Sequence, residues 1–256
     1  MRIDDLAGRA CLVTGSSRGI GAAVARGLGS SGARVAVHYR TGEAEARAVA
    51  ADVERAGGEA ILLAGDIAVP GTAARLVTET VTRFGRLDVL INNAGDLIER
   101  RPVAETQDEL LERQIAVNVR PVLEACRAAI AQFRAQGAGG AIVNVSSIAA
   151  RTGGGGGSAL YAGAKAFVAT MTRTMAREVA AEGIRVNCVS PGVIATPLQD
   201  RTTPPDMLAA VTAQIPMRRV GAAEDCVGAF LFLCSEAMSG YVTGQVIEVK
   251  GGLLMP

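Results

Sequence analysis

The stretch Ala10-Cys11-Leu12-Val13-Thr14-Gly15-Ser16-Ser17-Arg18-Gly19-Ile20-Gly21 decides the fold of this chain. Its first half is a short apolar run, and its second half places three glycines in a turn that opens a segment of helical periodicity. Such a turn leaves backbone N–H groups at a helix N-terminus, where they suit a pyrophosphate. The spacing Gly-x-x-x-Gly-x-Gly is a weak signal alone, so its position directly after a first strand carries the prediction.

Further apolar segments follow along the chain, separated by stretches of helical periodicity. The expected strands are residues 10–14, 34–38, 60–64, 87–91, 141–145, 185–189 and 245–249. Most are apolar almost throughout, as in parallel sheets that helices cover on both faces. We therefore predict one α/β domain over residues 1–256, with a doubly wound, parallel seven-stranded sheet.

The composition limits the possible partners and compartments. A formal net charge of +1 gives no field that would draw nucleic acid or an acidic membrane. No apolar run approaches the roughly 20 residues that span a bilayer, and the turn at Gly15 leaves no room for a signal peptide. The five cysteines contain no Cys-x-x-Cys pair, which favours small core residues in a reducing compartment. We expect a soluble, cytoplasmic protein without a metal site.

The end of the second strand bears on which dinucleotide the glycine turn would bind. NAD-binding sites usually place a carboxylate there, whereas the 2'-phosphate of NADP needs cations. The chain reads His38-Tyr39-Arg40-Thr41, without an acid, and Arg18 adds a second cation from the turn. We predict NADP(H) over NAD(H). The alternative is that both arginines are merely exposed and NAD is held by hydroxyls alone; His38 is expected to be a packing residue.

Tyr161 and Lys165 lie four residues apart at the start of a helical segment and share one face of it. A phenol has an ordinary pKa of about 10 and exchanges protons poorly near neutrality. A neighbouring ammonium favours the phenolate and would lower the pKa of Tyr161 toward the working pH. The Tyr-x-x-x-Lys spacing occurs by chance in many helices, so the prediction depends on the motifs around it.

Those motifs occur in a characteristic order. They are Thr14-Gly15-x-x-x-Gly19-Ile20-Gly21, Asn92-Asn93-Ala94-Gly95, Asn118, Ser146-Ser147, Tyr161-x-x-x-Lys165, Pro191-Gly192 and Tyr241-Val242-Thr243-Gly244. Over nearly its whole length the chain closely resembles the short-chain dehydrogenase/reductase family, near its 3-oxoacyl-acyl-carrier-protein reductase and sugar dehydrogenase-like branch. The resemblance implies a Rossmann-like fold and an NAD(P)-dependent oxidoreductase that acts on CH–OH groups.

The resemblance also implies a role for each site residue. Tyr161 would be the general acid or base, Ser147 would polarise the substrate oxygen, Lys165 would also hold the nicotinamide ribose, and Asn118 would hold a water of the proton relay. Asp66, otherwise a turn or cap residue, could accept a hydrogen bond from the adenine amino group. The expected cofactor contacts are Gly15, Ser17, Arg18, Gly19, Ile20, Gly21, Tyr39, Arg40, Thr41, Asp66, Ile67, Asn92, Ala94, Gly95, Tyr161, Lys165, Pro191, Gly192, Ile194 and Thr196.

One departure from the family concerns the spacing of the catalytic residues. Ser147 and Tyr161 are fourteen positions apart where relatives commonly have thirteen, and the run of glycines at 153–157 would absorb the extra residue. That run is read either as a flexible surface loop or as part of the site mouth. Ser147 is preferred over Ser146 because it is the second serine of the pair, the family's usual position.

Residues 197–219 lose strong periodicity, contain Pro204-Pro205 and resume a helix near 206–213, which is typical of a mobile substrate lid. The leading hypothesis is an oxidoreductase acting on a ketone or secondary alcohol. A second is a 3-oxoacyl-acyl-carrier-protein reductase, with Arg134 and Arg177 docking the acidic carrier unless they are simply solvated. A third is a non-catalytic NADP-binding sensor, against which the complete set of catalytic residues argues.

Two long alanine-rich helices, near 104–136 and 159–182, allow close approach between subunits. The resemblance implies a homotetramer. Composition alone does not exclude a dimer, because exposed alanine also serves simply as a helix former.

Overall fold

Seven parallel strands form one sheet in the order β3-β2-β1-β4-β5-β6-β7 in the computed structural model, which describes residues 2–255. The strands are β1 (Ala10–Val13), β2 (Arg34–Tyr39), β3 (Glu59–Ala64), β4 (Val89–Asn92), β5 (Gly140–Val145), β6 (Ile184–Pro191) and β7 (Val246–Val249). Each lies within two residues of its predicted bounds at either end, because the apolar runs that bury a strand on both faces also delimit it. The predicted doubly wound sheet is confirmed.

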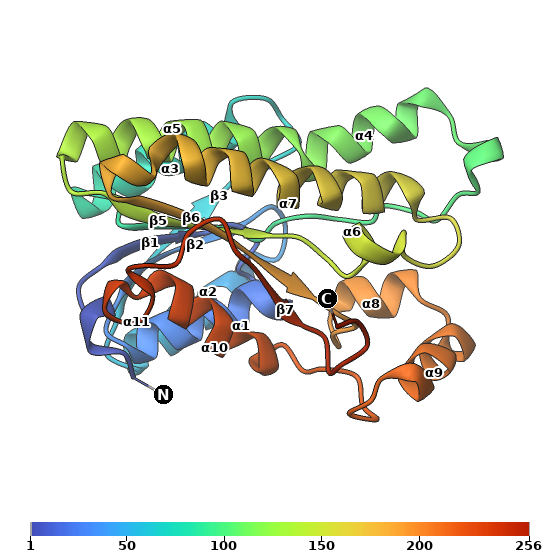
Figure 1. Ribbon diagram of the computed structural model, residues 1–256. Helices are drawn as coiled ribbons and strands as arrows, with labels where there is room; N and C mark the ends of the chain where they lie inside the picture. Colours follow the sequence, from blue (N-terminus) through green and yellow to red (C-terminus); the bar gives the residue numbers. More distant parts are fainter. Residues whose placement is uncertain (1, 256) are drawn as a thin grey trace.

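Helices cover both faces of the sheet (Figure 1). One layer holds α3 (Thr72–Phe84), α4 (Asp108–Asn118), α5 (Arg120–Gln136) and α7 (Ala159–Val179); the other holds α1 (Gly19–Ser30), α2 (Glu43–Arg55), α10 (Glu224–Cys234) and α11 (Glu236–Ser239). Alternate strand residues supply the two cores. Val13 packs with Val24 and Phe230 on the α1 side, and Leu12 packs with Leu76 and Phe133 on the α3 side.

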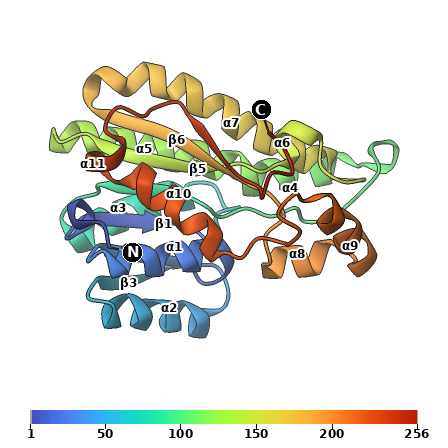
Figure 2. The ribbon, with the colours of Figure 1, turned by 60° about the horizontal axis from the view of Figure 1, so that its bottom comes forward.

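The remaining short elements lie near the ends of the strands. They are the 3-10 turns η1 (Asp4–Leu6), η2 (Val103–Glu105) and η3 (Ala180–Glu182), and the helices α6 (Ala149–Thr152), α8 (Pro197–Thr202) and α9 (Pro205–Gln214). Helices α8 and α9 stand together beyond the carboxyl ends of the strands, below the α6 turn in Figure 1 and at the same end of the molecule in Figure 2. The predicted helix near 206–213 is α9, and α8 was not anticipated.

Two helix predictions need correction. The expected helix over 104–136 is interrupted at Val119, where ψ is −61° and φ is −114°, so that α5 begins anew with Pro121 in its first turn. Proline is well tolerated there because its missing N–H has no intrahelical partner in a first turn. The helix expected over 159–182 ends at Val179 and continues only as η3. Within residues 2–255, no helix is both long and apolar enough to cross a bilayer.

The strand order reverses between β1 and β4, where successive connections leave on opposite faces. Ligands of doubly wound sheets bind in the crevice at the carboxyl ends of the strands near this switch point. Register aligns the strands that end there: Val13 lies beside Val37 and Ile91, and Asn92 beside Asn144. The glycine turn and the Asn92–Gly95 segment therefore meet at one edge of the sheet.

Candidate active site

The glycine turn after β1 provides an open helix N-terminus. Gly15 and Gly19 have φ of 65° and 56°, and a Cβ at Gly21 would collide with the Gly15 carbonyl oxygen. The N-cap Arg18 makes no side-chain cap hydrogen bond, so the first N–H groups of α1 remain available to an anion. Tight backbone approach without a side-chain cap is the arrangement that a dinucleotide pyrophosphate requires, and the turn therefore fits such a cofactor.

His38 holds this turn in place from the neighbouring strand. Its Nδ1 accepts a hydrogen bond from the Gly15 N–H at 2.9 Å, and its Nε2 lies 3.1 Å from the Gly65 carbonyl oxygen. Since Nδ1 accepts, we assign the neutral tautomer with hydrogen on Nε2. Burial lowers the pKa of His38 and supports the neutral form. The predicted packing residue is thus also a positioning residue for the glycine turn.

Thr14 and Asn93 fasten the turn to the segment after β4. The Thr14 hydroxyl accepts hydrogen bonds from the N–H groups of Asn93 and Ala94, both at 3.0 Å. The Asn93 side-chain amide donates to the carbonyl oxygens of Thr14 and Gly15 at 2.9 and 3.0 Å. Asn92, one residue earlier, points into the core, where it donates to Asn144 Oδ1 at 2.9 Å.

The other predicted cofactor residues surround the same crevice. Thr196, the N-cap of α8, places its methyl group 3.3 Å from where a Cβ at Gly19 would stand, so the Pro191-Gly192 loop approaches the glycine turn. Asp66 accepts a hydrogen bond from the Ala68 N–H at 2.9 Å, which is the turn role considered for it. Ile67 and Ile194 are buried, and Tyr39 is partly buried at the end of β2.

Two cations lie where the adenosine ribose would be expected. Arg18 and Arg40 are exposed, and neither forms an ion pair with any residue from 2 to 255. The Arg18 guanidinium reaches across to the Thr41 hydroxyl at 3.5 Å. The turn and the end of β2 therefore present two guanidinium groups and a hydroxyl together.

Ser147 and Tyr161 come together despite the extra residue between them. Ser147 lies close enough to Tyr161 to lower the pKa of its phenol, against the larger opposite effect of burial. Ser146 instead is buried and donates to the Lys165 carbonyl oxygen at 2.8 Å, which fixes the end of β5 against α7. The structure thus brings Ser147, and not Ser146, to the tyrosine.

The pKa of Tyr161 is shifted in the direction opposite to the one expected. Lys165 Nζ lies 5.8 Å from the centre of the Tyr161 ring and donates to the Val145 carbonyl oxygen at 3.0 Å. Burial dominates both groups: it raises the pKa of Tyr161 to about 12 and lowers the pKa of Lys165 to about 8. Loss of hydration around the Tyr161 hydroxyl therefore disfavours its ionised form more strongly than the Lys165 ammonium favours it.

Asn118 is fully buried at the end of α4, next to the break in the helix. Its amide brackets Asp96, with Nδ2 donating to the Asp96 carbonyl oxygen at 2.7 Å and Oδ1 accepting from the Asp96 N–H at 3.1 Å. A Cβ at Gly95 would stand 2.7 Å from Asn118 Oδ1 and 2.9 Å from Lys165 Nζ. Asn118, Gly95 and Lys165 therefore meet at one point.

The glycine run at 153–157 is anchored by hydrogen bonds from Arg100 and Arg101. The Arg101 N–H donates to the Gly157 carbonyl oxygen at 2.8 Å, and Arg100 donates to Gly156 O at 3.2 Å and to Thr202 O at 2.8 Å. Arg100 thus bridges the glycine run and α8. The run lies at the mouth of the site, one of the two interpretations of its composition.

Known proteins place this arrangement in a family. The model of a family described as enoyl-(acyl carrier protein) reductase matches residues 15–254. A 3-oxoacyl-[acyl-carrier-protein] reductase from Synechocystis is 35% identical over 98% of both chains, and an L-rhamnose 1-dehydrogenase (NAD(P)(+)) from Sphingomonas is 37% identical over 97% of both. The chain belongs to the short-chain dehydrogenase/reductase family. It is therefore a nicotinamide-dependent oxidoreductase, as its motifs predicted.

A solved structure extends the likeness to three dimensions. The crystal structure of an NADH-dependent reductase responsible for alginate metabolism covers 99% of this chain and 100% of its own, with 34% identity and a TM-score of 0.90. These short-chain dehydrogenase/reductase relatives thus include one that uses NADH and one named for both NAD and NADP.

The positioning residues His38 and Asn93 were absent from the predicted set. The signal for His38 was available, because parallel pairing of the first two strands puts residue 38 beside the start of the glycine turn. Asn93 stood in a quoted motif, but its bonds depend on how the two turns pack, which spacing does not reveal. No group of three or more His, Cys, Asp or Glu within residues 2–255 could hold a metal ion.

Proposed function

We propose that this protein is an NADP(H)-dependent oxidoreductase that interconverts a ketone and a secondary alcohol. The observation that carries the proposal is that Ser147 lies close enough to Tyr161 to influence the pKa of its phenol, with the buried Lys165 one helical turn away. When bound, the nicotinamide supplies or accepts the hydride. Every other part of the reaction falls to side chains of this chain.

Tyr161 and Ser147 act on the substrate oxygen. In reduction, the Tyr161 hydroxyl donates a proton to the oxygen as negative charge develops on it, and the Ser147 hydroxyl donates a second hydrogen bond there. In oxidation, Tyr161 takes the proton back. Lys165 keeps positive charge beside the phenol, and Asn118 joins the proton relay through a water as the family resemblance implies. Since burial raises the pKa of Tyr161, the positive charges around it matter for both directions.

The preference for NADP(H) rests on Arg18, Arg40 and Thr41. Two exposed guanidinium groups without acidic partners among residues 2–255, and no carboxylate directly after β2, favour a ligand with a 2'-phosphate. The glycine turn and the uncapped N-terminus of α1 would hold its pyrophosphate. Tyr39, Asp66 and Ile67 would border the adenosine. The remainder of the cofactor would be bordered by Ala94, Gly95, Pro191, Gly192, Ile194 and Thr196.

For the substrate, the names of the relatives point in two directions. One is named for rhamnose, and another for an acyl-carrier protein. Arg134, one of the two candidate docking cations, is engaged in a two-fold hydrogen bond with Glu182 at 2.6 and 2.7 Å. Because its charge is already paired, and only Arg177 remains, we favour a small carbonyl or alcohol such as a sugar over a carrier-bound acyl chain.

The test follows NADPH absorbance during reduction of a panel of ketones and of a 3-oxoacyl thioester. The reverse reaction is measured with sugars as the alcohol substrates. We expect turnover that Tyr161→Phe abolishes and that is faster with NADPH than with NADH. Arg134→Glu/Arg177→Glu should leave the kinetics unchanged, whereas selective loss of thioester turnover would make the acyl-carrier alternative the better one. Tight NADPH binding without any turnover would support the sensor instead.

We also propose a homotetramer. Large apolar side chains are exposed on the helical layer that holds α4, α5 and α7, among them Leu111 and Leu123 at about two-fifths exposure and Phe167 at 46%. Apolar side chains of this size gathered on neighbouring long helices are typical of a subunit interface. The proposal needs a measurement of mass in solution.

A further inference from the structure

Three hydrogen-bonded contacts join α8 to the segment after β4, across more than 100 residues of chain. Arg201 of α8 pairs with Asp96, with Nη2 and Oδ1 2.5 Å apart, and donates through Nη1 to the Ile98 carbonyl oxygen at 3.3 Å. Arg100 donates in return to the Thr202 carbonyl oxygen at 2.8 Å. Helix α8 begins the 197–219 segment that we regard as the substrate lid, so these contacts hold its first helix against the site.

Asp96 connects these contacts between α8 and the segment after β4 with the catalytic residues. Its backbone is held on both sides by Asn118, and its neighbour Gly95 is packed against Lys165 Nζ. Its Oδ1 accepts a hydrogen bond from the Ile98 N–H at 2.8 Å, and Ile98 has a φ of 65°, which non-glycine residues rarely adopt. The segment is therefore held in a strained conformation by bonds from the catalytic side and from α8.

We propose that Arg201 is a positioning residue that couples closure of α8 over the site to the proton chemistry of Tyr161, through its ion pair with Asp96. This inference rests on the proposed function, because it concerns the same tyrosine. It adds a residue outside the family motifs, on an element that the sequence did not reveal.

The physical basis is the sign of the charges around Tyr161. Lys165 Nζ lies 5.8 Å from the centre of the Tyr161 ring, and the negative charge of Asp96 acts on Tyr161 from the segment after β4. Arg201 of α8 pairs with that carboxylate. The negative charge of Asp96 opposes ionisation and is one of the causes that raise the pKa of Tyr161, after burial. Pairing with Arg201 reduces this opposition, so the tyrosine ionises more readily with α8 in place than with α8 displaced.

The experiment measures the pH dependence of kcat/KM for alcohol oxidation, which requires ionised Tyr161. In Arg201→Gln the carboxylate is uncompensated, and the rise in rate should move up by about 0.5 to 1 pH unit. In Asp96→Asn it should move down. Because Arg201 acts through Asp96, the double variant should match Asp96→Asn. Arg201→Lys keeps the charge and should restore most of the wild-type profile.

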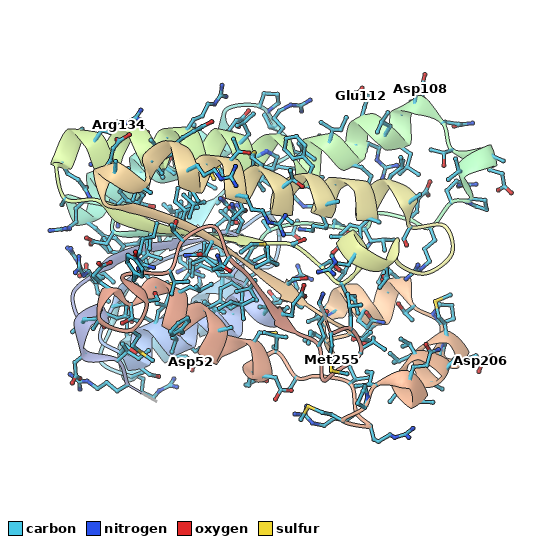
Figure 3. All side chains as sticks on the ribbon, in the orientation of Figure 1. Asp52, Asp108, Glu112, Arg134, Asp206 and Met255 are labelled. Atoms are coloured by element: carbon cyan, nitrogen blue, oxygen red, sulfur yellow. The ribbon has the colours of Figure 1, made fainter. Side chains whose placement is uncertain are left out.

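Arg134→Gln is the matched control, because it breaks an exposed arginine–carboxylate pair far from the site. Figure 3 shows Arg134 at the end of the molecule opposite Asp206, which lies in the lid. It should leave the profile unchanged. The proposal is overturned if Arg201→Gln lowers activity without moving the profile, or if the shift caused by Arg201→Gln persists in the Asp96→Asn background.

A second readout separates this inference from the proposed function. The ultraviolet absorbance of tyrosinate, taken as the difference between each enzyme and its Tyr161→Phe counterpart, follows Tyr161 without any substrate. If no ketone or alcohol is turned over, the same order of shifts in this titration still supports the coupling. Equal titrations in wild type, Arg201→Gln and Asp96→Asn would contradict the proposed coupling.

Discussion

A lysine with its side chain buried beside Tyr161 costs stability as long as it carries its charge. Lys165 is 3% exposed, and its ammonium donates a hydrogen bond to the Val145 carbonyl oxygen. Desolvation is the first cause of its lowered pKa, with a partial opposing effect from Cys188. The residue is therefore retained for what its ammonium does in the site, at the expense of the folded state.

This cost predicts how stability depends on pH. The pKa of Lys165 is about 8 in the folded state and 10.5 ordinarily, so between these values the unfolded chain binds more protons and stability rises with pH. We expect Lys165→Met to be inactive, to be more stable than wild type at pH 7 by roughly 1 to 3 kcal/mol, and to lose most of this advantage by pH 9.5. Urea unfolding at pH 7, 8 and 9.5 measures the difference; an equal gap at each pH would contradict the argument.

The position of His38 predicts how cofactor binding changes at acidic pH. Its neutral Nδ1 accepts from the Gly15 N–H, and protonation would replace this acceptor with a second donor. Because burial lowers its pKa from the ordinary value of about 6.5, dinucleotide affinity should still be constant at pH 6.5 and should weaken only at more acidic pH. His38→Leu, which leaves the Gly15 N–H unpaired, should weaken NADPH binding by about tenfold at pH 7.5 and abolish this acid limb. Calorimetric titration across pH 5 to 8 checks both effects.

At the scale of the element, the glycine run offers a matched pair of positions. Gly157 has a φ of 74°, and a Cβ there would stand 2.7 Å from the Arg101 nitrogen; Gly156 has no atom within 4 Å of such a Cβ. Gly157→Ala should displace the run from Arg101, cost about 1 to 2 kcal/mol of stability and raise KM several-fold with little change in kcat. Gly156→Ala should match wild type. Equal kinetics for both variants would mean that the run is a free surface loop.

The elements also show where prediction from sequence works. The strands were located to within two residues, because an apolar run buried on both faces is a local property of the chain. The break at Val119 was missed although Pro121 marked it, since a proline inside an expected helix is a boundary signal. Helix α8 is six residues long, and it depends on its Thr196 cap and on Arg100 and Arg201, which join it to residues over 100 positions away.

The candidate site likewise has features that are local in the sequence and features that depend on how distant elements pack. Tyr161 and Lys165 could be predicted because helical spacing places them on one face, and Ser147 because the family resemblance favours the second serine after the fifth strand. The pKa of Tyr161 could not be anticipated, because it depends on how deeply neighbouring elements bury the phenol. His38 and Asn93 act through bonds that exist only after β1, β2 and β4 have paired, and Asp96 acts through an ion pair with α8, which lies more than 100 residues away.

For the molecule as a whole, binding of the cofactor is a stability measurement as well as an affinity. A ligand at 100 times its dissociation constant adds about 2.7 kcal/mol, which raises the melting temperature of a chain of this size by several degrees. NADPH should raise it more than NADH at equal concentration. Arg18→Gln/Arg40→Gln should remove this difference while keeping the response to NADH, and a larger response to NADH in the wild type would reverse the cofactor proposal.

The proposed tetramer is the remaining property of the whole molecule, and we expect its subunits to meet through the face that α4, α5 and α7 present. Light scattering after size exclusion should give four times the 26.2 kDa of the chain. Phe167→Glu places a charge among exposed apolar side chains and should reduce the mass to that of a smaller assembly, because a buried, unpaired carboxylate costs several kcal/mol per interface. Val69→Glu is the control, since Val69 is 56% exposed in the connection between β3 and α3 and should leave the mass unchanged. A monomer in the wild type, or an unchanged mass in Phe167→Glu, would show that this face does not join subunits.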